Sequence, residues 1–178
     1  MNYFILAVFT LSLAFATEDN FEIEAKALAT DLKMSLMKNL SEKIAKDGPV
    51  EAVPFCHSNV KPIAKTAAKD RTAKFEFGRT SHKVRNIENA PQDWAIGYLK
   101  EFEGKKKGEV KKASIIHQLK DGKRIYIEPL YVEAKCLLCH GENVGKNIID
   151  KIQKTYPKDQ ATGFKLGEFR GFIWVKEK

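Results

Sequence analysis

The chain is poor in cysteine, with only three among 178 residues. So few cysteines exclude a small fold held together by disulfides, and because three is an odd number, at least one thiol has no disulfide partner within the chain. The sequence also lacks an internal repeat and a domain linker. With 43% hydrophobic residues at this length, we expect one globular domain with its own core, not a disordered chain.

Long hydrophobic runs are also scarce. Only the first sixteen residues form an uncharged, apolar run, and no second run follows. The run ends in Ala14-Phe15-Ala16, the small-x-small pattern that signal peptidase reads, although it has no Lys or Arg at its start. A membrane span takes about 20 apolar residues, which is longer than this run. We therefore expect a signal peptide over 1–16, a single mature domain over 17–178, a periplasmic or secreted location, and no membrane span after cleavage.

Acidic residues are the minority among the charges, with 23 Asp and Glu against 31 Lys and Arg and a net charge of +8. Much of the excess lies between Lys100 and Arg124, where nine basic and four acidic residues give a net of +5. The middle of this segment, 103–112, contains glycine and no aromatic residue on which a base could stack. We expect a solvated loop that attracts an acidic partner protein, and no binding of nucleic acid.

Hydrophobic spacing predicts helices first and strands later. Leu or Ile recurs every four residues from Leu28 to Ile44, which indicates a helix over 21–46, and Gly48-Pro49 ends it. The Asp121-Gly122 pair predicts a two-residue hairpin turn. We expect further helices over 50–57, 61–69, 91–103 and 145–156, and strands over 75–77, 114–119, 124–130 and 169–175. This order indicates an α+β domain with an antiparallel sheet.

Two of the three cysteines stand in Cys136-Leu-Leu-Cys139-His140, the spacing of covalent c-type haem attachment. Two thiols at this spacing can form thioethers with both vinyl groups of one porphyrin, while the imidazole of His140 binds the iron as proximal ligand. Three other interpretations use these residues. A redox Cys-x-x-Cys pair needs a thioredoxin-like βαβ setting, which the predicted elements lack; a zinc site would add Cys56 as a fourth ligand; and the third is a simple Cys136–Cys139 disulfide. We expect haem c, since export places the chain where such attachment occurs.

Three motifs, in the same order along the chain, resemble the bacterial c-type-haem PAS-like domain family. They are Gly78–Trp94 (GRTSHKVRNIENAPQDW), Cys136–Gly141 (CLLCHG) and Tyr156–Gly171 (YPKDQATGFKLGEFRG). That family occurs both as small exported cytochromes and as the sensing part of signalling proteins. The resemblance implies a PAS-like antiparallel sheet with N-terminal helices, one covalent haem packed on it, and axial ligation of the iron by His140 and Cys56.

The unpaired thiol of Cys56 agrees with this implication. Ferric iron lowers the pKa of a bound thiol, and the anionic sulfur offsets positive charge on the haem. The alternative is a buried, inert cysteine. Other side chains could also be the sixth ligand, namely His57, His82, His117, Met34 and Met37. Each has a simpler structural role as a core, surface or satisfied side chain. Only His57, next to Cys56, is kept as a second candidate.

Several basic residues lie in the same motifs. A haem carries two propionates, and arginine forms bidentate pairs with carboxylates. Arg79 and Arg85, together with Lys83 and Arg170, are therefore candidate propionate ligands, and solvated surface charge is the alternative.

A thiolate ligand stabilises ferric iron and lowers the reduction potential. We therefore expect an exported mono-haem c-type cytochrome, not an enzyme, that acts in redox sensing or low-potential electron transfer. The alternatives are a haem-based sensor of a gas or small molecule and a peroxidase-like enzyme with an exchangeable sixth ligand.

Overall fold

The computed structural model describes residues 20–178, so the signal peptide predicted over 1–16 lies outside the described residues. The main elements follow in the order α1 (Asn20–Ala68), β1 (Phe75–Thr80), α2 (Asp93–Phe102), β2 (Ile115–Gln118), β3 (Arg124–Tyr131), α3 (Leu137–His140), α4 (Lys146–Thr155) and β4 (Phe169–Glu177). Three short 3-10 turns connect them: η1 (Lys69–Ala73), η2 (Ile87–Asn89) and η3 (Ala134–Cys136). The predicted α+β class, with helix before an antiparallel sheet, is confirmed.

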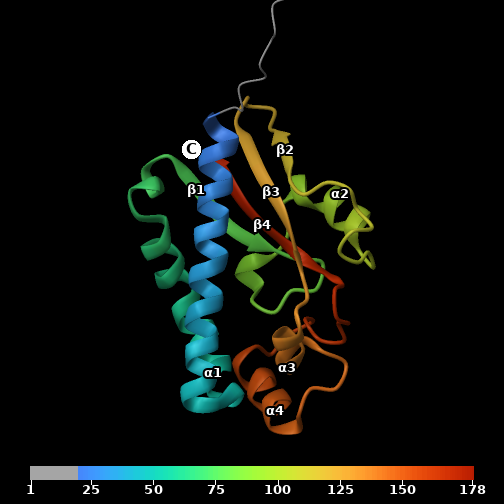
Figure 1. Ribbon diagram of the computed structural model, residues 1–178. Helices are drawn as coiled ribbons and strands as arrows, with labels where there is room; N and C mark the ends of the chain where they lie inside the picture. The colour runs from blue at the N-terminus through green and yellow to red at the C-terminus, as the bar shows by residue number, and fades with distance from the viewer. Residues whose placement is uncertain (1–19) are drawn as a thin grey trace, which may run out of the picture.

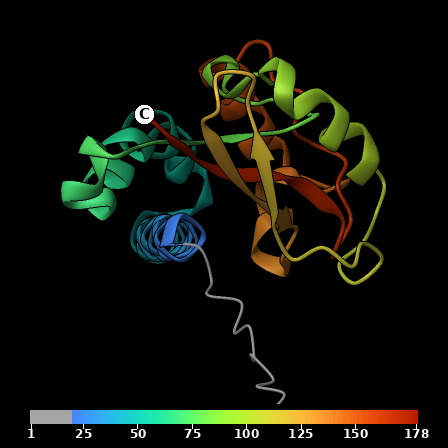
Figure 2. The same ribbon diagram turned by 90° about the horizontal axis from the view of Figure 1, so that it is seen from above.

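The four strands form one antiparallel sheet in the order β1-β4-β3-β2. Because side chains alternate along a strand, each strand supplies both faces of the sheet. On β3, Tyr126 packs against α1, while Ile125 and Ile127 pack against α2. Figure 2 shows α1 and α2 on opposite sides of the sheet. The molecule therefore has a helix layer on each face, and α1 forms the larger one.

Helix α1 consists of two arms that meet at Gly48, whose φ of 81° and ψ of 167° are not helical. The second arm returns beside the first (Figure 1). The break predicted at Gly48-Pro49 is correct. The separate helices predicted over 50–57 and 61–69 are wrong in their boundaries, because the second arm continues to Ala68 with Pro54 and Pro62 inside it.

The first arm of α1 is longer than the sheet that it covers. Its first half buries Phe21, Ala25, Leu28, Ala29 and Leu32 against the sheet. Its second half extends past the sheet toward α3 and α4 (Figure 1), and its apolar residues there are only half-buried. These residues are Leu36, Met37, Leu40 and Ile44. The helix thus presents an apolar stripe to the end of the molecule where α3 lies.

The β2–β3 hairpin has a three-residue loop, so the predicted two-residue turn is wrong. Leu119 and Lys123 are still paired, since the Leu119 amide donates to the Lys123 carbonyl at 2.8 Å. Gly122 has a φ of 87°, which fits the left-handed position of a three-residue loop. Within residues 20–178, no helix is both long and apolar enough to cross a membrane.

Candidate functional site

The Cys-x-x-Cys-His segment follows β3 directly and forms two short helical turns, η3 and α3. It lies at the end of the sheet, opposite the second half of the first arm of α1 (Figure 1). The Gly141 amide donates to the Leu137 carbonyl at 3.1 Å and ends the turn. A Cβ on Gly141 would lie 2.7 Å from that carbonyl oxygen, so a larger residue would disturb the end of α3.

His140 is fixed through both its backbone and its ring. Its carbonyl accepts from the Phe164 amide at 2.9 Å, and its Nδ1 lies 2.6 Å from the carbonyl oxygen of Ala161. Burial lowers the pKa of His140 well below its ordinary value, and the Arg170 and Arg85 cations lower it further. The ring is therefore neutral, and Nδ1 carries the proton that the carbonyl accepts. Nε2 keeps its lone pair and can bind a metal.

All three cysteines are free and half-buried. Cys139 packs against a buried apolar cluster that the second arm of α1 and α4 form with Tyr156. Cys56 also lies on the second arm, where burial raises the pKa of its thiol, and the Arg79 and Arg85 cations oppose that rise. The fold therefore brings Cys56, which is distant in sequence, close to the Cys-x-x-Cys-His segment.

The zinc alternative would require Cys56, Cys136, Cys139 and His140 to converge on one point. In the described part of the chain, no three side chains of Cys, His, Asp or Glu converge in the way that the ligands of a metal ion would. The Cys136–Cys139 disulfide is likewise not formed.

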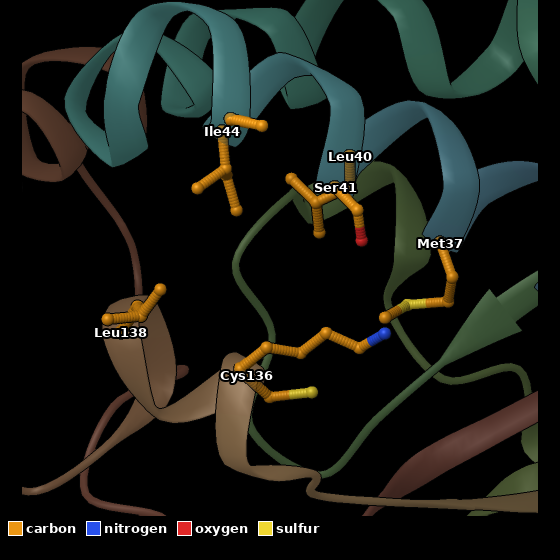
Figure 3. Close-up of a pocket in the computed structure, with 8 residues that line it drawn as sticks. Met37, Leu40, Ser41, Ile44, Cys136 and Leu138 are labelled. Atoms are coloured by element: carbon orange, nitrogen blue, oxygen red, sulfur yellow. The ribbon is translucent and has the colours of Figure 1, made fainter.

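An apolar pocket separates α1 from the Cys-x-x-Cys-His segment (Figure 3). Met37, Leu40 and Ile44 form the α1 wall, and Cys136 and Leu138 form the opposite wall. Cys136 and the α1 residues line the same space (Figure 3). The half-buried stripe of α1 and the free thiol thus border the same cavity, which suits an apolar group attached at Cys136.

Three cations, Arg170, Lys83 and Arg79, lie near His140 or near the Phe164 ring beside it. Arg170 donates to the Ser81 hydroxyl at 2.6 Å, and its guanidinium lies 4.9 Å from the centroid of the Phe164 ring; Lys83 Nζ lies 4.7 Å from the same centroid. Arg79 is half-buried, and its guanidinium forms no hydrogen bond or ion pair with any described residue. Burial, with the neighbouring Arg79 and Arg85 cations, lowers the pKa of Arg170 to about 10. These cations therefore lack matching acids, and a ligand with two carboxylates would supply them.

Arg85 differs from these cations because the protein already uses its guanidinium. It forms an ion pair with Asp159, with Nε 2.9 Å from Oδ1, and it donates to the carbonyls of Cys139 at 2.7 Å and Ala161 at 3.2 Å. The sequence analysis groups Arg85 with the candidate propionate ligands and does not pair it with Asp159. No local pattern could have paired them, since they are 74 residues apart.

The other candidate ligands of the sequence analysis have varied surroundings. His57 is exposed and lies edge-on to Tyr156, and His117 forms a 3.0 Å hydrogen bond with Tyr98, far from the pocket. Met34 is 67% exposed, whereas Met37 lines the pocket. His82 lies against Phe164 and Phe169, and its buried Nδ1 has no partner among the described residues.

One ligand would match the features of this site: a flat apolar body beside the α1 stripe, two carboxylates near the cations, and a metal at Nε2 of His140. A haem has these properties, so the residues present fit it.

Comparison with known proteins agrees with the sequence resemblance. A family model with the description "Tll0287-like: Tll0287" matches residues 15–177. The chain belongs to the Tll0287-like family.

A solved structure shares the fold of this Tll0287-like chain. It is described as the crystal structure of the cyanobacterial heme-protein Tll0287, with a TM-score of 0.53 and 24% sequence identity. The similarity covers 87% of this chain and 88% of that one. A search of the curated proteins finds no match. The long helix and the antiparallel sheet are thus shared with a protein that is described as a heme-protein.

Proposed function

We propose that this protein is an exported mono-haem c-type cytochrome. Cys136 and Cys139 hold the haem through thioethers, and His140 is the proximal ligand. One observation carries the proposal: Nδ1 of His140 is held by the Ala161 carbonyl, which leaves Nε2 available directly beside two free cysteines. The description of the solved relative as a heme-protein supports it.

The surroundings of the motif supply the rest of the binding site. Met37, Leu40 and Ile44 cover the apolar body of the haem, because they line the same pocket as Cys136. Arg79 and Arg170 bind the propionates, since neither has a carboxylate partner within residues 20–178. The bound haem supplies a one-electron oxidation and reduction. The chain holds it, excludes water from its apolar face and balances its charge.

Cys56 is the proposed sixth ligand. It is half-buried, and its electrostatic neighbours are Arg79, Arg85 and Cys139, whereas His57 is exposed and packs against Tyr156. Burial favours the neutral thiol, so the metal and Arg79 together must stabilise the thiolate. A thiolate ligand favours the ferric state and gives a low reduction potential.

A low potential suits either low-potential electron transfer or redox sensing that is relayed by contact with another protein. The basic segment between α2 and β3 serves as the docking surface for an acidic partner, because seven of its lysines are exposed: Lys105, Lys106, Lys107, Lys111, Lys112, Lys120 and Lys123. Stopped-flow reduction by candidate periplasmic donors separates the two roles. An electron carrier is reduced rapidly, and more slowly as salt is added, whereas a sensor shows no such fast exchange.

The test of the haem assignment is a pyridine haemochrome spectrum of protein matured in a periplasm that contains the c-type attachment machinery. We expect the band of a haem with two thioether bonds. Cys136→Ser and Cys139→Ser should each shift the band toward that of a haem with one thioether, while Cys56→Ser should keep the band of the wild type. A spectrum without any thioether band would contradict the proposal.

A further inference from the structure

The Ala161 carbonyl is shared by two donors. His140 Nδ1 donates to it at 2.6 Å, and Arg85 Nη2 donates to it at 3.2 Å. A carbonyl oxygen has two lone pairs, so it can accept both hydrogen bonds. The cationic donor draws electron density from the oxygen, and this weakens the oxygen as an acceptor for the imidazole. The strength of the His140 hydrogen bond therefore depends on the position of Arg85.

Arg85 is held in position by Asp159. The two side chains are 13% and 9% exposed, and both guanidinium contacts, at 2.9 Å and 3.2 Å, are short. Asp159 Oδ1 also accepts from the Ala161 amide at 3.0 Å. Asp159 thus fixes the peptide whose carbonyl binds His140, as well as the arginine that shares this carbonyl. The same guanidinium donates to the Cys139 carbonyl at 2.7 Å, one residue before His140.

We infer that Arg85 and Asp159 together form a positioning unit for His140. The pair fixes the orientation of the imidazole ring, and it weakens the Nδ1–H hydrogen bond, so that the imidazole gains less negative charge. This inference rests on the proposed function, in which Nε2 of His140 binds the haem iron. A weaker hydrogen bond at Nδ1 makes the imidazole a weaker donor to the metal. The pair therefore holds the reduction potential above the value that an unshared carbonyl would give.

Two other roles for Arg85 make different predictions. If Arg85 acted only as a nearby positive charge, lysine could replace it. If it bound a propionate, Asp159 would be unnecessary for its effect. The structure favours the positioning role, because Nε and Nη2 are already directed at three protein acceptors, namely Asp159, Cys139 and Ala161.

The test uses the haem-loaded protein with the variants Arg85→Lys, Arg85→Gln, Asp159→Asn and the double variant Arg85→Gln/Asp159→Asn. Lysine keeps the charge but cannot reach all three acceptors. Without the guanidinium on the Ala161 carbonyl, that oxygen accepts more strongly from His140. We therefore expect Arg85→Lys to change the ferric EPR g-values, lower the midpoint potential, and slow exchange of the His140 Nδ1 proton in the reduced protein by about tenfold. Because the pair acts as a unit, the double variant should exchange this proton about as fast as Arg85→Gln does alone.

Arg124→Lys is the matched control, since Arg124 forms a similar bidentate pair with Glu177 at the other end of the sheet. We expect it to leave the EPR signal and the potential unchanged. Wild-type values in Arg85→Lys, or additive effects of Arg85→Gln and Asp159→Asn, would overturn the inference. Absence of haem c from the wild type would instead contradict the proposed function. In that case exchange of the same proton in the haem-free chain still tests the positioning role.

Discussion

Cys56 and His57 are neighbours on the second arm of α1 but have different surroundings. A helix turns by about 100° per residue, so adjacent side chains point in different directions. Cys56 is half-buried beside Arg79 and Cys139, while His57 is exposed against Tyr156. In the proposed haem site, the choice between these two ligands would therefore depend on which face of one helix meets the Cys-x-x-Cys-His segment.

Cys56→Ser tests this choice. A serine hydroxyl is a poor ligand for ferric iron, so we expect loss of the low-spin ferric signal with thiolate character in absorption and EPR, and a rise in reduction potential. His57→Ala is the control, and its spectra should match those of the wild type. If Cys56→Ser kept the ferric low-spin signal and His57→Ala lost it, the ligand would be His57.

For the proposed site, the sequence offers candidate residues but not the partners that those residues have in the fold. Spacing alone brings Cys136, Cys139 and His140 together, and the odd number of cysteines singles out Cys56. Pairings across long sequence separations leave no local signal. Arg85 therefore looked equivalent to Arg79, although only Arg85 has a carboxylate partner, Asp159.

At the scale of elements, the predictions succeed where hydrophobic periodicity is strong and fail where a local breaker competes with packing. The first arm of α1, α2, α4 and the four strands all appear near their predicted positions. The sequence analysis expects a gap between the helices 50–57 and 61–69, but the second arm stays helical through it to Ala68, with Ala52, Val53 and Ala68 buried. Tertiary packing thus overrides local propensity in this arm.

The kink at Gly48 makes the second arm return toward the site. With φ at 81° and ψ at 167°, Gly48 occupies a region that is nearly exclusive to glycine. Gly48→Ala should therefore lower the free energy of unfolding by about 1–3 kcal/mol in urea denaturation. Because Cys56 follows the kink, we also expect a weaker thiolate signal in the haem-loaded variant.

Gly97→Ala is the matched control for this prediction. Gly97 lies inside α2, where an added Cβ would meet no atom within 4 Å. Alanine favours the helix, so this variant should raise the free energy of unfolding by about 0.5–1 kcal/mol. Equal effects of both substitutions would contradict the assignment of strain to Gly48.

At the scale of the whole molecule, the site lies where three parts of the chain meet beyond the edge of the core. The second half of the first arm of α1 extends past the sheet, the Cys-x-x-Cys-His segment closes the opposite side, and the second arm brings Cys56 from a third direction. Without a ligand, the apolar stripe of α1 and the cations that lack acidic partners lower the free energy of unfolding. The haem-free chain should therefore be the less stable form.

The stability of the haem-free chain should also depend on pH through His140. Burial lowers the pKa of His140 in the folded state well below the unfolded value of about 6.5, so the unfolded chain binds more protons below that pH. Stability is then fully present above about pH 6.5 and falls as the pH decreases, by at most about 1.4 kcal/mol per pH unit from this group. Burial also lowers the pKa of His82, which adds to the effect in the same direction.

Urea denaturation of haem-free Cys136→Ser/Cys139→Ser protein between about pH 7.5 and pH 5.5 measures this dependence. Replacing His140 by Gln in that background should flatten the curve, because the amide cannot take up a proton. The same slope with and without His140 would show that its ring is not held neutral by the fold. In that case the lone pair of Nε2 would not be reserved for a metal, and the binding site would need a different proximal ligand.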